Sequence, residues 1–266
     1  MKNLKSDDWY ELKKVAQTRL GPNEISGWFA ASLIYSLVIL GTSIFALVQG
    51  AYLNKEFWKP IVIVAGVLFI TQVIIGVFFS NMRNIYDHQK IEAVCLSITA
   101  TKLSIDGYLF FFMLADENMI EKSVINIFIL VALAGIILMI ISTIRGIKRV
   151  KQGHFREGGD GLYDFKNSKG YISFVGVYSV VILVTILCKV INNYGNNIMK
   201  VIIVLIPLLV VQYGVSIAIP EFYLLTYCKF KYDEFIIPVP KGHKELYNRQ
   251  LKVNEKSKNK KIKVKK

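Results

Sequence analysis

The stretch VINIFILVALAGIILMIISTI, residues 124–144, decides the fold class of this chain. It carries no charged side chain over 21 residues. As an α-helix it would extend about 30 Å, which matches the hydrocarbon core of a lipid bilayer. The stretch therefore predicts a transmembrane helix.

Comparable apolar runs occur along the rest of the chain, and 53% of its 266 residues are hydrophobic. A soluble domain of this size needs fewer apolar residues to form one core, so the surplus is expected to face lipid. Four further runs predict spans at about 27–52, 60–80, 171–191 and 201–227. The acidic residues Asp7, Asp8 and Glu11 precede the first run, which is long enough to stay as an anchor and does not resemble a cleavable signal.

The last run contains Pro207 and Pro220. Proline frees a backbone carbonyl inside a membrane helix and usually kinks it. We therefore expect the helix to bend or to end near Pro220, which would place Glu221 at the membrane interface.

Residues 92–115 are less clear as a span, because they include Lys102 and Asp106 beside a strongly apolar stretch. The distribution of Lys and Arg decides in favour of a crossing, since these residues accumulate in short cytoplasmic loops. With this span included, the N-terminus, the loop at 145–170 and the basic tail all fall on one side. The sequence thus predicts an all-α polytopic bundle of six transmembrane helices in a cell membrane, with both termini in the cytoplasm.

The segments that flank the bundle have their own patterns. Residues 1–26 form a cytoplasmic amphipathic segment, in which Ser6 to Leu20 predict a short helix that either lies in the membrane interface or packs on the surface of a loop. Residues 229–266 form a basic cytoplasmic tail, and eleven of the 33 Lys and Arg residues lie between Lys241 and Lys266. The tail accounts for most of the formal charge of +14, so nucleic acid is not an expected partner. It suits either contact with anionic lipid headgroups or a plain topogenic and solubilising role.

Four polar side chains inside the predicted spans are candidates for function. Lys102 and Asp106 are four residues apart on one helix face, which permits an ion pair. Charged groups in the bilayer usually pair, face the bundle interior or line a polar pathway, although Lys102 could instead snorkel toward an interface. Gln72 and Gln212 are expected first to form hydrogen bonds between helices. The alternatives for the charged pair are therefore a pathway or partner site and a purely structural role.

One glycine-rich loop resembles a ligand-binding loop weakly. It runs from Arg156 through Asp160 to Asp164, and it lacks both the Lys-Ser/Thr ending of a phosphate loop and the acidic spacing of a calcium loop. We interpret it as a surface turn that could dock a cytoplasmic partner.

The sequence shows no nucleophile, metal-binding or cofactor motif, so we expect a protein that is not an enzyme and has no cofactor or metal. Two functions fit the pattern. The first is a non-enzymatic partner-binding protein, such as an immunity or accessory protein of a bacterial membrane that recognises a toxin. The second is a six-helix permease subunit of an exporter driven by a separate ATPase.

Overall fold

The computed structural model describes residues 5–162 and 197–240. The predicted fifth span at 171–191, Asp164 and the tail from Lys241 lie outside these residues. Within the described part the chain is all-helical.

Five described helices are long and apolar enough to cross a membrane, which supports a membrane-embedded bundle. They correspond to the predicted first, second, third, fourth and sixth spans. These helices are α2 (Pro22–Gln49), α3 (Lys55–Phe78), α5 (Gln89–Glu117), α6 (Lys122–Lys151) and α8 (Asn197–Lys231). Short helices accompany them: η1 (Ser6–Trp9), α1 (Tyr10–Gln17), α4 (Met82–Asp87) and η2 (Asp233–Phe235).

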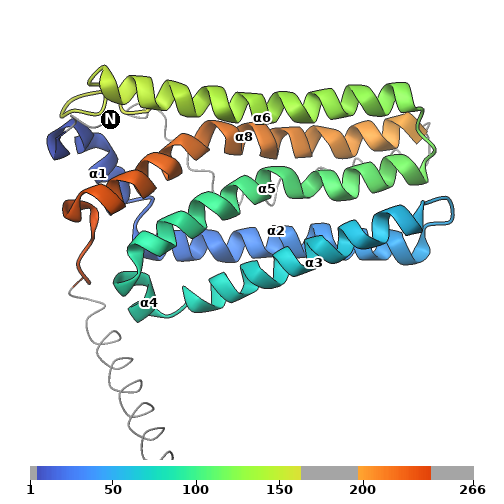
Figure 1. The fold of residues 1–266 in the computed structure, drawn as a ribbon, viewed down its shortest axis with the longest axis horizontal. Helices are drawn as coiled ribbons and strands as arrows, with labels where there is room; N and C mark the ends of the chain where they lie inside the picture. The colour runs from blue at the N-terminus through green and yellow to red at the C-terminus, as the bar shows by residue number, and fades with distance from the viewer. Residues whose placement is uncertain (1–4, 163–196, 241–266) are drawn as a thin grey trace, which may run out of the picture.

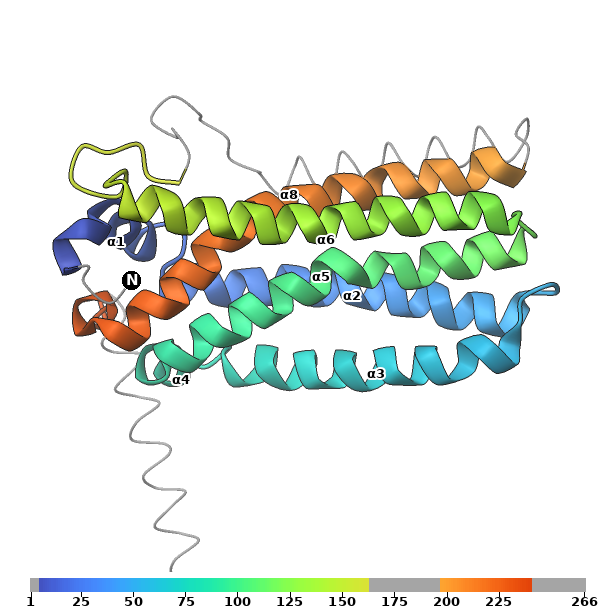
Figure 2. The same cartoon turned by 45° about the horizontal axis from the view of Figure 1, so that its top comes forward.

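Local capping explains where the helices differ from the predicted spans. We expected the second span to start at Pro60, yet α3 starts at Lys55 because the Asn54 side chain accepts a hydrogen bond from the backbone N–H of Phe57 at 3.3 Å. The last helix does not end at Pro220. Instead α8 continues to Lys231 and changes direction along its length (Figures 1 and 2).

The long helices lie side by side, with α5 in the middle of the bundle (Figure 1). Its most extensive packing is against α8 and α2, while α6 packs on α8 and α3 packs on α2. Accordingly, α5 has the largest buried share of the five helices and is also the least apolar of them. A helix surrounded by protein can carry polar groups that a lipid-facing helix cannot.

The chain crosses between two ends of the bundle (Figure 2). At the first, which we call the α1 end, α1 and α4 lie beside the starts of α2 and α5 and the ends of α6 and α8. At the other, the turn end, short turns join α2 to α3 and α5 to α6, and α8 begins there.

The outward faces of the long helices are apolar, as a bilayer requires. Large aliphatic side chains on them are more than half exposed. Examples are Ile34, Val38, Ile63, Val64, Ile70, Ile74, Leu130, Ile137, Ile140 and Ile141.

The N-terminal segment packs on the α1 end. Trp9, Leu12 and Ala16 are buried there in one cluster with residues of α6 and α8. The predicted helix from Ser6 to Leu20 is thus realised as η1 and α1, which together end at Gln17, and its apolar side chains contact protein. This packing favours the second alternative, a helix on the protein surface.

Candidate functional site

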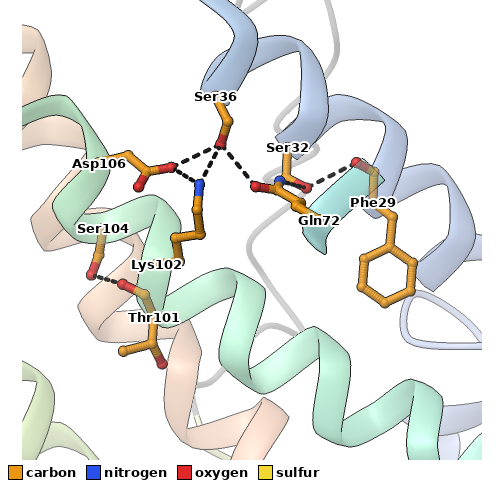
Figure 3. A network of polar contacts seen from close by, with 8 residues as sticks. All are labelled: Phe29, Ser32, Ser36, Gln72, Thr101, Lys102, Ser104 and Asp106. Carbon is orange, nitrogen blue, oxygen red and sulfur yellow. Dashed lines mark hydrogen bonds and ion pairs between the residues drawn. The ribbon is translucent and has the colours of Figure 1, made fainter. Parts of the chain in front are cut away.

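Five polar side chains from three helices meet inside the bundle, and we call them the polar cluster (Figure 3). Its members are Ser32 and Ser36 of α2, Gln72 of α3, and Lys102 and Asp106 of α5. The α2 and α3 members are buried, whereas the Lys102 and Asp106 side chains keep 17% and 19% of their surface exposed.

Ser36 is the centre of the polar cluster. Lys102 and Asp106 form an ion pair, and the Ser36 hydroxyl oxygen lies 3.1 Å from Lys102 Nζ and 2.8 Å from Asp106 Oδ2. It also lies 3.1 Å from Gln72 Oε1. A hydroxyl has one hydrogen, so Ser36 accepts from Lys102 and donates either to the carboxylate or to the amide oxygen.

The polar cluster continues from Gln72 to the α2 backbone. Gln72 Nε2 donates to Ser32 Oγ at 3.0 Å, and Ser32 in turn donates to the Phe29 carbonyl at 2.9 Å. The chain of hydrogen bonds therefore ties α2, α3 and α5 together while the paired charges cancel. Such a network stabilises one arrangement of helices in an apolar surrounding, where an unpaired polar group would be costly.

The charged members of the polar cluster and Ser36 lie near the middle of their helices. Lys102 and Asp106 are near the middle of the 29-residue α5, and Ser36 is near the middle of the 28-residue α2. The Lys102 amine binds Asp106 and Ser36 within the bundle, an arrangement that differs from snorkelling along the helix toward an interface. The structure thus brings three of the four predicted intramembrane polar residues into one site.

The fourth residue, Gln212, forms a separate contact among α5, α6 and α8. Its Oε1 accepts from the Tyr108 hydroxyl at 2.5 Å, and its Nε2 donates to the Ala132 carbonyl at 2.9 Å. Ser216, one turn later, lies 3.1 Å from the Gly135 carbonyl. Gln212 also contributes to the wall of an apolar groove of about 210 Å³ between α5 and α6.

Gly135 allows α6 to approach Gln212, and this yields a first prediction. A Cβ at Gly135 would lie 2.2 Å from Gln212 Cδ, so Gly135→Ala must displace the amide that Tyr108 and Ala132 hold. We expect a loss of about 1–3 kcal/mol, as for overpacking elsewhere, measured by thermal unfolding in detergent.

Gly214→Ala on α8 is the matched control, since nothing lies within 4 Å of its added Cβ. It should be neutral or slightly stabilising, because alanine favours a helix over glycine. An equal loss of stability in both variants would contradict the close contact at Gly135.

The predicted loop residues Arg156 and Asp160 lie at the α1 end. Arg156 Nε donates to Asp8 Oδ1 at 2.8 Å, and His154 Nδ1 lies 3.8 Å from Asp160. The pKa of Asp8 is lowered, first by the hydrogen bond from the Lys5 backbone N–H and then by Arg156. In this structure the loop therefore binds the N-terminal segment of the same chain.

A buried charged pair at the α1 end was missed by the sequence analysis. Glu92 of α5 and Lys229 of α8 are both fully buried and interact electrostatically. Neither carboxylate oxygen of Glu92 has a hydrogen-bond partner among the described residues, and Lys229 Nζ is 3.5 Å from Gln89 Oε1.

Gln89 also contacts the segment that follows α8. Gln89 Nε2 donates to the Ile237 carbonyl at 2.7 Å, and its Oε1 accepts from the Ile237 N–H at 3.0 Å. Phe235 is buried in the core of the α1 end. The bundle thus extends beyond residue 228, because Lys229 and the segment after α8 pack against α5. In the sequence, the only sign of this packing was that the predicted last span continues past Pro220.

Ion pairs also join the N-terminal segment to α8 and to η2. Arg19 pairs with Glu221, whose side chain is 8% exposed, and Lys13 Nζ lies 2.8 Å from Glu234. Glu221 therefore contacts protein at the α1 end.

Within residues 5–162 and 197–240, no group of three or more His, Cys, Asp or Glu side chains is placed to hold a metal ion. No protein-family model, characterised protein or solved structure matches this chain.

Proposed function

We propose that this chain is a multi-pass protein of a bacterial cell membrane, with six spans and both termini in the cytoplasm. It acts without catalysis by binding a protein partner, as an accessory or immunity protein does. The coarser statement, a membrane protein with several apolar helices, follows from the fold.

The positions where the described chain stops and resumes support a sixth crossing. α6 ends at the α1 end, and the described chain stops soon after it, at residue 162. It resumes with α8 at the turn end. The sequence between these two positions includes the apolar run at 171–191.

The distribution of basic residues supports the orientation. Among the described residues, most Lys and Arg are at the α1 end, which is expected to face the cytoplasm. Those at the α1 end are Lys5, Lys13, Lys14, Arg19, Arg83, Lys90, Arg145, Lys148, Arg149, Lys151, Arg156, Lys229 and Lys231. Those at the turn end are Lys55, Lys59, Lys122 and Lys200.

A labelling experiment tests this topology. Cys95, Cys188 and Cys228 are replaced by alanine, and single cysteines are introduced by Tyr52→Cys, Gln152→Cys or Lys266→Cys. In intact cells a membrane-impermeant maleimide should label only the first variant, and the other two should react after permeabilisation. Labelling at position 266 in intact cells, together with labelling at position 52 and protection of position 152, would mean an odd number of crossings and would exclude six spans.

The observation that carries the binding proposal is the turn of residues 50–54 between α2 and α3. We call it the braced turn, because two carboxylates of α5 hold its backbone. Glu117 accepts hydrogen bonds from the backbone N–H groups of Ala51 at 3.1 Å and Tyr52 at 3.2 Å. Asp116 accepts from the Asn54 N–H at 3.0 Å and from Trp58 Nε1 at 2.9 Å. Two carboxylates thus hold the turn in one shape.

Large side chains are exposed at the turn end, in the braced turn and in the neighbouring turn between α5 and α6. Tyr52 and Met119 are each 67% exposed, and both lie in the turns of this end. A rigid turn that presents an aromatic side chain loses little entropy when a partner binds, and tyrosine is frequent among the residues that dominate binding energy. The polar cluster adds a second support, because its groups are satisfied within the chain, as expected of a protein that folds without a partner subunit.

Purification of the tagged protein from native membranes in mild detergent, with mass spectrometry of what accompanies it, tests the function. A secreted protein or peptide that is retained by the native chain and lost from Tyr52→Ala would support the proposal. Phe45→Ala is the matched control, since this aromatic side chain is 68% exposed within α2. A stoichiometric nucleotide-binding ATPase would overturn the proposal in favour of the permease subunit.

A further inference from the structure

The outward face of α6 changes from apolar to basic near the α1 end. Gly146 faces α8, where its Cβ would lie 3.1 Å from Pro220, so the opposite side of α6 faces away from the bundle. Ile137, Ile141 and Ile144 lie on that side and are about half exposed. The next exposed positions along it are Lys148 and Lys151, with Arg145 beside them.

The three cations are available to bind a ligand. Arg145, Lys148 and Lys151 form no ion pair or hydrogen bond among the described residues. The end of α6 does not need them as caps, because the Lys148, Arg149 and Val150 carbonyls already accept backbone N–H groups at 3.0–3.1 Å. The neighbouring Arg149 differs, since its Nε donates to the Gly161 carbonyl at 3.0 Å and stabilises the loop.

If the hydrocarbon core ends near Ile144, the spacing along the helix places Arg145 and Lys148 at headgroup depth and Lys151 at its outer edge. At about 1.5 Å per residue, Lys148 and Lys151 lie roughly 6 and 10 Å beyond Ile144. The headgroup layer begins where the hydrocarbon core ends and is about 5–8 Å thick on each side. An acyl chain beside the isoleucines would therefore bring its own phosphate to the three cations.

We propose that Arg145, Lys148 and Lys151 form a binding site for the headgroup of an anionic phospholipid, whose acyl chains lie along the isoleucine ridge of α6. This site is separate from the partner-binding turn and from the basic tail, so it goes beyond the proposed function. Charge complementarity selects an anionic headgroup over a zwitterionic one, because three cations face it and none of them has an ion-pair partner among residues 5–162 and 197–240.

Native mass spectrometry of the full chain, titrated with phosphatidylglycerol or phosphatidylcholine in detergent, tests the site. The variant Arg145→Gln, Lys148→Gln, Lys151→Gln removes three charges at the α6 end. The control Lys55→Gln, Lys59→Gln, Lys122→Gln removes three at the turn end. Both keep the tail and have the same net charge.

The first phosphatidylglycerol should bind the α6 variant at least about tenfold more weakly than the control, since each basic residue near a headgroup contributes roughly a fivefold effect. Binding of phosphatidylcholine should be equal in the two proteins. Equal phosphatidylglycerol affinity in both variants would overturn the proposal and assign headgroup binding to the tail. An equal loss for both lipids would overturn it too, because the contact would then not depend on charge. The unfolding temperature of each variant checks that the fold is retained.

Discussion

Lys229→Met is expected to destabilise the bundle by about 1–3 kcal/mol, the usual cost of leaving a buried polar group without its partner. Lys229 and Glu92 have no exposed surface, and neither Glu92 oxygen has a hydrogen-bond donor among the described residues. The methionine would fill a similar volume, so the loss would arise from the Glu92 carboxyl group, which would stay buried at the α1 end without the amine that interacts with it. Thermal or denaturant unfolding in detergent measures the effect.

The double variant Glu92→Gln, Lys229→Met should recover most of this stability, because it removes both charges and keeps the packing. Replacing a whole buried pair by neutral groups is often close to neutral. Lys90→Met is the control at the same end, where Lys90 is partly exposed and lies 3.7 Å from Asp233. That variant should change stability by at most about 1 kcal/mol. A double variant as unstable as Lys229→Met alone would show that the pair is not the cause.

The positions of the long apolar helices were predicted well from the sequence, because a run of apolar residues is a local property. The five described long helices cover the five predicted runs outside 171–191. Their ends were predicted less well, since the end of a helix depends on single contacts. Asn54 starts α3 before Pro60, and contacts with α5 hold α8 and the segment after it beyond Pro220.

The polar cluster was predictable only where its contacts lie within one helix. The spacing of Lys102 and Asp106 on α5 indicated their ion pair. Their contact with Ser36 depends on how α2 sits against α5, which no local pattern encodes. Ser32 and Ser36 have no charge or spacing that indicates such a role in the sequence, and only the structure gives both a hydrogen-bonding role.

Lys229 shows the same limit at the α1 end. In the sequence it lies among basic residues that continue into the tail, so a solvent-exposed position was the natural expectation. The structure buries it because the last turns of α8 pack against the start of α5, beside Gln89 and Glu92. Burial of a charge in this way follows from tertiary packing alone.

Asp106→Ala alone should harm membrane insertion and stability more than the double variant Lys102→Ala, Asp106→Ala. The single change leaves the Lys102 ammonium near the middle of α5 with only the Ser36 hydroxyl as a partner. A lone charge at this depth costs about 2.5–3.5 kcal/mol on insertion scales, and the double change removes that charge. Insertion into membranes and the unfolding temperature in detergent should rank the proteins as native, double variant and Asp106→Ala.

The same two variants separate a structural role of the polar cluster from a functional one. If the ion pair only joins α2 to α5, the double variant should retain the partner found by purification, because the braced turn is about 10 residues away along α5. If the pair contacts a partner or lines a pathway, the double variant should be stable and still lose its partner or its protective effect. Equal stability and equal partner binding in all three proteins would show that the pair has neither role. The hydrogen bond from Gln72 to Ser32, which joins α3 to α2, would then be the part of the cluster that holds the helices.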